Sequence, residues 1–148
     1  MGTLISPAAQ RLAASLLLLA PYLPLLFMGE EYGEEHPFQF FCSFSDSALI
    51  GNVRRGRRRE FESFHAYGGK VPDPQDEATF AASRLTWSWE ADPRKAGLRC
   101  LYQDLLRFRR ECPALSDYSQ RSARMIPDTQ SGAILELVRG DGGLTPEG

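Results

Sequence analysis

The longest apolar stretch of the chain, residues 12–28, constrains its fold more than any other feature, and Ser15 is the one clearly polar residue within it. A membrane-spanning helix needs about 20 apolar residues. Pro21 and Pro24 interrupt this stretch, and a proline removes a main-chain hydrogen bond from a helix. Arg11 and the leucines after it resemble a signal peptide, but no small-residue cleavage site follows. We therefore expect the stretch to be buried in a folded protein, with no membrane as partner.

The same stretch divides into two predicted elements. Ser6 and Pro7 are typical of a helix start, a capping hydroxyl followed by proline at the first helical position. Residues 8–20 are apolar on nearly every face, which predicts a helix buried on several sides. Residues 23–28 form a continuous apolar run closed by Gly29, which favours a strand buried on both faces of a parallel sheet. A helix followed by such a strand indicates an α/β protein.

Further helices are predicted at residues 46–67, 78–84 and 94–112. The last has a single apolar stripe and stops before Pro113. A loop is expected at residues 71–76, and the pattern at residues 85–89 is ambiguous.

Residues 133–139 predict a strand, and residues 140–143 offer the glycines of a hairpin turn. The partner strand would follow this turn, and the sequence stops at Gly148 before supplying it. An all-apolar helix and a lone strand both need neighbours. We therefore expect a fragment of a larger α/β protein. The alternative is a small helical domain that packs residues 8–20 against residues 94–112.

Composition and charge exclude several classes of protein. Hydrophobic residues make up 43% and charged residues 24%, as in an ordinary globular protein, and the net charge is −2. Five arginines lie between residues 54 and 59, but Gly56 and Glu60 interrupt the positive field. We interpret this segment as a solvated or ion-paired helix face, and we expect no nucleic-acid partner.

Three cysteines without a CxxC pair favour a reduced compartment, so we expect a cytoplasmic protein. The sequence has no metal-ligand cluster, phosphate-binding loop or dinucleotide fingerprint. We therefore expect no cofactor and no metal.

Several motifs, in order, carry a resemblance to a known family. Residues 24–31 place Pro24, Phe27, Gly29 and Glu31 in the pattern of the last barrel strand of the α-amylase superfamily (glycoside hydrolase family 13). The continuation at residues 37–41, 54–61, 71–75, 79–87 and 101–115 resembles the trehalose-releasing hydrolases of that superfamily. The resemblance covers about residues 4–116.

The resemblance implies part of a (β/α)8 barrel, whose chemistry lies at the C-terminal ends of its strands. Residues 1–116 would supply the penultimate helix, the last strand and the last helix. Residues 117–148 would begin a C-terminal β-sandwich domain. The implied reaction is hydrolysis of the α-1,4 bond next to the trehalose end of a malto-oligosyltrehalose, which releases trehalose.

A retaining glycosidase of this kind needs a carboxylate nucleophile and a carboxylic acid about 5–5.5 Å apart. The resemblance implies that these residues, and a third acid, come from strands that precede this chain. No His-Asp pair of the expected type accompanies His36 or His65. We therefore assign no catalytic residue, and we expect the chain alone to be inactive.

The candidate substrate-binding residues follow the predicted strand. Glu30 and Glu31 would lie at the barrel mouth, and alternation along a strand would point them to opposite faces. They either contact sugar or form an ion-paired rim in which one pairs with an arginine. Phe38 and Phe41 could cover the apolar face of a sugar, and Gln39 could bond a hydroxyl. The alternative is that both phenylalanines pack the loop.

Trp87 and Trp89 are expected in the core. Two other functions stay open: another α-amylase-type enzyme, such as a glucan branching enzyme, and an independent helical binding module that uses the arginine helix. The sequence leaves the oligomeric state open.

Overall fold

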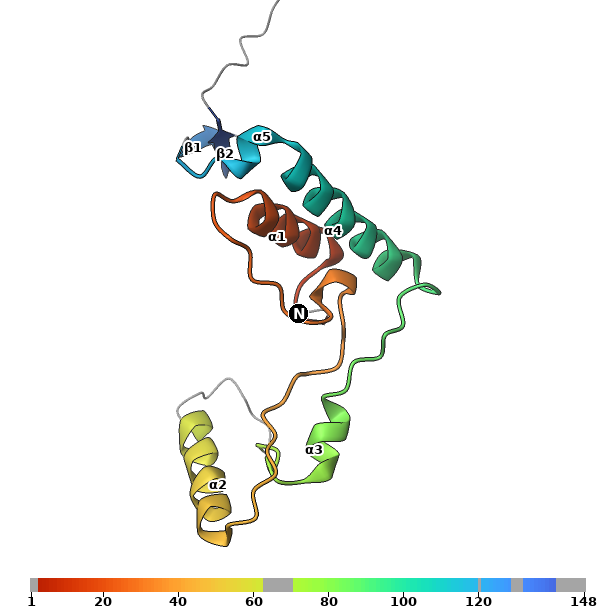
Figure 1. Cartoon of the computed structure of the whole chain (residues 1–148), viewed down its shortest axis with the longest axis vertical. Helices are drawn as coiled ribbons and strands as arrows, with labels where there is room; N and C mark the ends of the chain where they lie inside the picture. Colours follow the sequence, from red (N-terminus) through yellow and green to blue (C-terminus); the bar gives the residue numbers. More distant parts are fainter. Residues whose placement is uncertain (1–2, 63–70, 120, 129–131, 141–148) are drawn as a thin grey trace, which may run out of the picture. The chain divides into compact units, whose positions relative to one another are not determined.

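The computed structural model describes residues 3–62, 71–119, 121–128 and 132–140. The chain divides into two compact units, of which unit 1 comprises residues 1–34 and 88–148 and unit 2 comprises residues 35–87. Within these described ranges, the elements are helices together with one two-stranded antiparallel sheet (Figure 1).

Unit 1 begins with helix α1, Pro7–Leu19, in the place that the sequence predicts. The hydroxyl of Ser6 accepts a hydrogen bond from the main-chain N–H of Ala9 at 3.2 Å, and Pro7 occupies the first turn. This cap satisfies one of the N–H groups that the first turn leaves without a helical partner. The helix ends one residue before Ala20, ahead of Pro21.

Helix α4, Pro93–Glu111, confirms the other long predicted helix. Its start is capped by Asp92, whose carboxylate accepts from the N–H of Arg94 at 2.8 Å. Pro113 ends α4 as predicted, but it also begins the short helix α5, Pro113–Ser116, which was not predicted. A proline at the first helical position needs no N–H partner, so the same residue can end one helix and start the next.

The core of unit 1 lies between α1 and α4, which run side by side (Figure 1). Ala14 and Leu18 of α1 are buried against Leu98 and Tyr102 of α4. Leu101 and Leu105 pack at the edge of this cluster. The apolar stripe of α4 thus faces α1, as helical periodicity predicts.

Strands β1, Arg121–Asp128, and β2, Gly132–Arg139, form an antiparallel hairpin in which Arg124 lies opposite Glu136. The strand predicted at residues 133–139 is confirmed. The expectation that it has no partner in this chain is wrong, because β1, which precedes it, pairs with it. No alternation of buried apolar and exposed polar residues marks β1 in the sequence, which contains Pro127 and exposes Met125. Residues 141–143 of the predicted turn lie outside the described residues.

The strand predicted at residues 23–28 is wrong, because these residues have no regular secondary structure. Leu25 is 88% exposed and Phe27 is 52% exposed. A parallel strand is stabilised by main-chain hydrogen bonds to neighbouring strands. In the part of the chain that the structure describes, no other strand lies beside this segment to provide them.

Unit 2 contains helices α2, Ser47–Glu62, and α3, Glu77–Ala82. The carboxylate of Asp46 accepts from the N–H groups of Ala48 and Leu49 at the start of α2. The helix predicted at residues 46–67 is confirmed as far as Glu62, and residues 63–67 lie outside the described range. The loop at residues 71–76 is also as predicted, while residues 85–89 are irregular.

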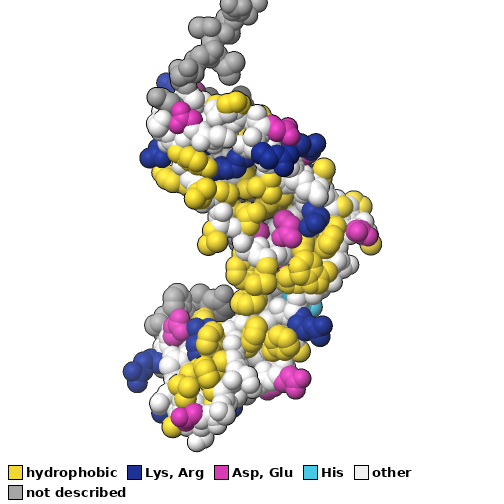
Figure 2. All heavy atoms as spheres, viewed as in Figure 1, with side chains coloured by type: hydrophobic (Ala, Val, Ile, Leu, Met, Phe, Trp, Pro, Cys, Tyr) yellow, Lys and Arg dark blue, Asp and Glu magenta, His cyan; other side chains and the backbone are white. Residues whose placement is uncertain are grey.

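Many large apolar side chains reach the surface, as the space-filling view shows over both units (Figure 2). Few side chains are buried, and Tyr32 and Leu18 are the largest that are fully so. Within the described residues, no helix is both long enough and apolar enough to cross a membrane.

Candidate functional site

The segment of residues 29–34, here called the acidic turn, holds the two candidate glutamates. Gly29 (φ 86°) and Gly33 (φ 69°) adopt left-handed conformations on either side of the 3-10 helix η1, Glu30–Tyr32. Such conformations favour glycine, which has no Cβ to clash. Because Glu30 and Glu31 lie on a helical turn, the expectation that strand alternation separates them is wrong.

Tyr32 anchors the acidic turn in unit 1. Its side chain is fully buried, and its hydroxyl donates a hydrogen bond to the Glu34 carboxylate at 3.0 Å. The N–H of Glu34 in turn donates to the carbonyl of Gly29 at 2.9 Å, which closes the turn. The Tyr32 ring also packs against Trp89, with ring centres 5.3 Å apart.

Glu31 is the glutamate that pairs with an arginine. Its carboxylate lies 3.4 Å from a guanidinium nitrogen of Arg99 on α4, and both side chains are about one-third exposed. The Arg99 guanidinium lies over the Trp89 ring, 4.2 Å from its centre. This cation–π contact joins α4 to the same aromatic residue that Tyr32 packs against.

Glu30 faces the interior of unit 1. Its carboxylate accepts a hydrogen bond from the Tyr102 hydroxyl at 3.2 Å. Burial, followed by the negative charge of Glu30, raises the pKa of the Tyr102 phenol well above its usual value. Tyr102 therefore stays a hydrogen-bond donor at physiological pH. Glu30 and Tyr102 line a cavity of about 70 Å³ together with Gln10 of α1.

The aromatic candidates belong to unit 2. The rings of Phe38 and Phe41 lie edge to face with centres 5.8 Å apart, and Phe41 contacts Phe80 of α3 at 5.1 Å. The main-chain N–H of Gln39 donates to the Ser83 hydroxyl at 3.0 Å. These contacts pack the loop against α3, while Phe38 stays 50% exposed. Phe80 was not predicted as part of this cluster, because nothing in the sequence near residue 80 indicates that it lies beside residues 38–41.

The acidic turn and the aromatic loop thus lie in different units. Arg99 and Tyr102 were also missed as site residues. Tyr102 lies in the apolar stripe of α4, so the sequence indicates only that it is part of the core. No pattern in the sequence distinguishes Arg99 from the other arginines. One turn of helix separates the two, so they share a face of α4.

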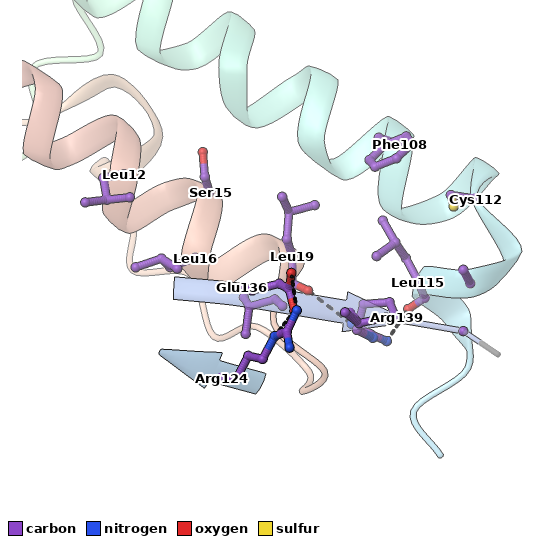
Figure 3. Close-up of a pocket in the computed structure, with 14 residues that line it drawn as sticks. Leu12, Ser15, Leu16, Leu19, Phe108, Cys112, Leu115, Arg124, Glu136 and Arg139 are labelled. Atoms are coloured by element: carbon purple, nitrogen blue, oxygen red, sulfur yellow. Dashed lines mark hydrogen bonds and ion pairs between the residues drawn. The ribbon is translucent and has the colours of Figure 1, made fainter. Parts of the chain in front are cut away.

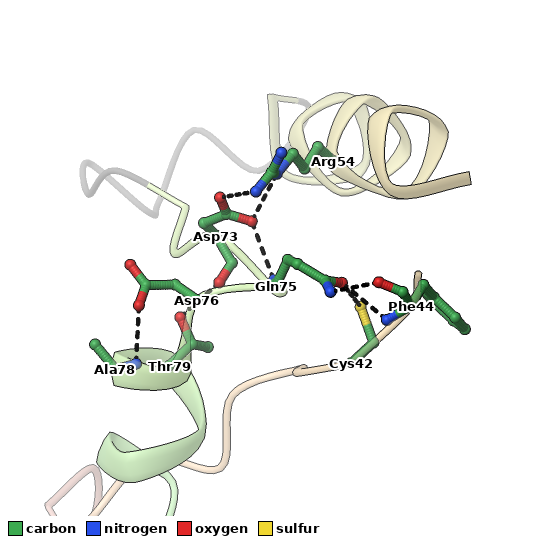
Figure 4. A network of polar contacts seen from close by, with 8 residues as sticks. All are labelled: Cys42, Phe44, Arg54, Asp73, Gln75, Asp76, Ala78 and Thr79. Atoms are coloured by element: carbon green, nitrogen blue, oxygen red, sulfur yellow. Dashed lines mark hydrogen bonds and ion pairs between the residues drawn. The ribbon is translucent and has the colours of Figure 1, made fainter. Parts of the chain in front are cut away.

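The arginines of α2 make contacts within unit 2. Arg54 lies 2.8 Å from the Asp73 carboxylate, which also accepts from the N–H of Gln75 (Figure 4). The hydrogen bond from Arg54 lowers the pKa of Asp73. Arg57 pairs with Glu60 at 2.6 Å and lies over the ring of Phe40. These contacts support the interpretation of an ion-paired face.

The expectation that both tryptophans lie in the core is wrong for Trp87, which is 63% exposed and has a positive φ of 53°. Trp89 is partly buried between Tyr32 and Arg99. Among the described residues, no group of three or more His, Cys, Asp or Glu side chains is placed to hold a metal ion.

Unit 1 also has a large open cavity of about 940 Å³ between α1, the α4–α5 corner and the hairpin (Figure 3). Its walls are mainly apolar and include Leu12, Leu16 and Leu115. Arg139 closes one end, where it donates to the carbonyls of Leu19 and Leu115 at 3.1 and 3.0 Å.

Comparison with known proteins identifies relatives of this chain, although no family model matches it. It is 44% identical over 140 residues to the malto-oligosyltrehalose trehalohydrolase of Arthrobacter ramosus, which covers 95% of this chain and 24% of the relative. It is 43% identical over 108 residues to the enzyme of the same name from Saccharolobus solfataricus, and the match covers 73% of this chain and 17% of the relative. It is 46% identical over 104 residues to the enzyme of the same name from Deinococcus radiodurans, and the match covers 70% of this chain and 17% of the relative.

A solved structure is also similar. A putative alpha amylase from Salmonella typhimurium superposes with a TM-score of 0.64 and 38% identity, over 78% of this chain and 20% of that one. The chain spans only about a fifth of the length of the relatives it matches, between 17% and 24%. Over that part, the chain is homologous to the malto-oligosyltrehalose trehalohydrolases and shares the structure of an alpha-amylase-type protein.

Proposed function

We propose that this chain is part of a glycoside hydrolase that cleaves the α-1,4 bond next to the trehalose end of a malto-oligosyltrehalose. The single observation that carries this proposal is the identity of 43–46% to trehalohydrolases of three organisms over 104–140 residues. The substrate is a malto-oligosaccharide that ends in trehalose, and trehalose is the product.

We further propose that residues 1–116 supply the last strand and the last two helices of a (β/α)8 barrel, and that residues 117–148 begin a β-sandwich. The similarity to an alpha-amylase-type structure supports this arrangement. The exposure of Leu23, Leu25 and Phe27 supports it too, since contiguous apolar surface marks a place where other polypeptide packs. In a barrel, residues 23–28 would gain the parallel neighbours that a strand requires.

The substrate-binding candidates remain Glu30, Glu31, Phe38, Gln39 and Phe41. Their contacts differ in what they support. Glu30 faces the interior, which favours a supporting role, whereas Glu31 and Arg99 form a partly exposed pair whose hydrogen-bonding groups a sugar hydroxyl could share. Phe38 keeps half of its surface exposed, so a sugar face could cover it.

A segment exchange tests the proposed function. The matching part of the Arthrobacter ramosus trehalohydrolase is replaced by residues 4–116 of this chain, and the products from maltotriosyltrehalose are separated. Release of trehalose and maltotriose is expected. A folded exchange protein that transfers glucan chains instead would favour a branching enzyme, and one with neither activity would contradict the proposal. The control is the same exchange with the matching segment of the Deinococcus radiodurans relative.

A further inference from the structure

The acidic turn has two attachments to α4, and both come from one face of that helix. Arg99 reaches the carboxylate of Glu31 at 3.4 Å, and Tyr102 reaches that of Glu30 at 3.2 Å. Adjacent glutamates are therefore held by residues three positions apart, which is the spacing of neighbours on a helix surface. Two attachments one turn apart fix the rotation of the acidic turn as well as its position.

The main chain around the acidic turn gives its two glutamates little other support. Left-handed glycines flank it, and its own main-chain bonds join Gly33 to Glu30 at 3.1 Å and Glu34 to Gly29 at 2.9 Å. The segment before it has no regular structure and is exposed at Leu25 and Phe27. Tyr32 supplies an apolar anchor. Orientation of the two carboxylates therefore depends on side-chain contacts to α4.

We propose that Arg99 and Tyr102 are positioning residues, which hold Glu31 and Glu30 of the acidic turn in the orientation that a malto-oligosaccharide meets. The role toward substrate rests on the proposed function, whereas the attachment itself does not. Trp89 supports both attachments, because its ring contacts the Arg99 guanidinium and the buried Tyr32 ring. Tyr102 suits its role because its phenol stays protonated and keeps donating to Glu30.

Amide hydrogen exchange of the full chain tests this inference at the N–H groups of Gly33 and Glu34. Arg99→Gln removes the guanidinium with its contacts to Glu31 and Trp89, and Tyr102→Phe removes the hydroxyl that donates to Glu30. We expect exchange at both amides to quicken about tenfold, while the amides of Ala14 and Leu18 in the core stay unchanged. Arg99→Lys restores a cation and should recover part of the protection. Arg107→Gln is the matched control, since Arg107 pairs with Asp104 within α4 and should leave the turn unaffected.

Two results would overturn the inference. One is exchange at Gly33 and Glu34 that stays within about twofold of the unsubstituted chain in both variants. The other is equal quickening at the turn and at the core, or exchange at the turn already as fast as in an unstructured peptide before substitution. Trehalose release plays no part in this readout, so failure of the attachment and failure of the proposed function are separable.

Discussion

Arg109 of α4 donates a hydrogen bond to the main-chain carbonyl of Leu18 at 2.5 Å, across 91 positions of sequence. The same guanidinium donates to the carbonyls of Ala20 at 3.0 Å and Tyr22 at 2.5 Å. The last carbonyls of a helix have no partner within it, and a cation there also complements the helix dipole. Arg109 thus caps the C-terminal end of α1 and connects it to α4.

Replacement of Arg109 by Met should destabilise unit 1 by about 1–3 kcal/mol, because partly buried carbonyls lose their donors. Thermal unfolding followed by circular dichroism measures the change. Arg110→Met is the control: the Arg110 side chain is 75% exposed and pairs with its neighbour Glu111, so its replacement should cost less than about 0.5 kcal/mol. Equal effects of the two substitutions would contradict this role of Arg109.

Tyr102 makes unit 1 sensitive to alkaline pH. Burial and the charge of Glu30 raise the pKa of its phenol in the folded chain. Above about pH 10 the unfolded chain releases this proton while the folded chain keeps it, so the free energy of unfolding falls as pH rises. Tyr102→Phe should flatten the fall of Tm between pH 9 and 11, whereas Tyr22→Phe, at an exposed residue, should not. An unchanged slope in Tyr102→Phe would count against the burial of this phenol.

Two glycines should respond to alanine in opposite directions. Gly33 has a φ of 69°, and an added Cβ would lie 3.2 Å from the Gln10 side-chain oxygen. Gly33→Ala should therefore cost about 1–3 kcal/mol. Gly56 lies within α2 with open space around it, so Gly56→Ala should stabilise that helix by up to about 1 kcal/mol. Urea unfolding measures both, and a neutral Gly33→Ala would refute the geometry of the acidic turn.

The chain alone should release no trehalose from maltotriosyltrehalose, since the resemblance implies catalytic carboxylates from other strands. The measurement is product chromatography after prolonged incubation, with the Arthrobacter ramosus enzyme as positive control. Trehalose release that persists through purification and disappears in Glu31→Gln would show that the chain carries its own catalytic group.

The sequence predicted the elements whose signals are local. Ser6 and Pro7 placed the start of α1, and the apolar stripe of α4 placed the helix and its buried face. The strand predicted at residues 23–28 was wrong, because an apolar run forms a parallel strand only where neighbouring strands can pair with it. β1 was missed because its structure depends on pairing with β2, and its few apolar residues, such as Met125 and Ile126, do not alternate with polar ones.

The candidate site was predictable only in part. Glu30 and Glu31 stood out as carboxylates after an apolar run, but their partners Arg99 and Tyr102 lie about 70 positions away. Tertiary packing alone brings such residues together. Residues 24–28 are irregular where a barrel requires a strand, and their exposed apolar side chains fit a segment that other polypeptide would cover.

A crystal structure of the segment-exchanged Arthrobacter ramosus enzyme tests the central claim most directly. The account predicts that residues 24–28 form a strand with parallel neighbours on both sides, and that the acidic turn opens onto the cleft that holds the catalytic carboxylates. An ordered exchange protein in which these residues stay irregular, or in which Glu30 and Glu31 lie far from that cleft, would contradict it.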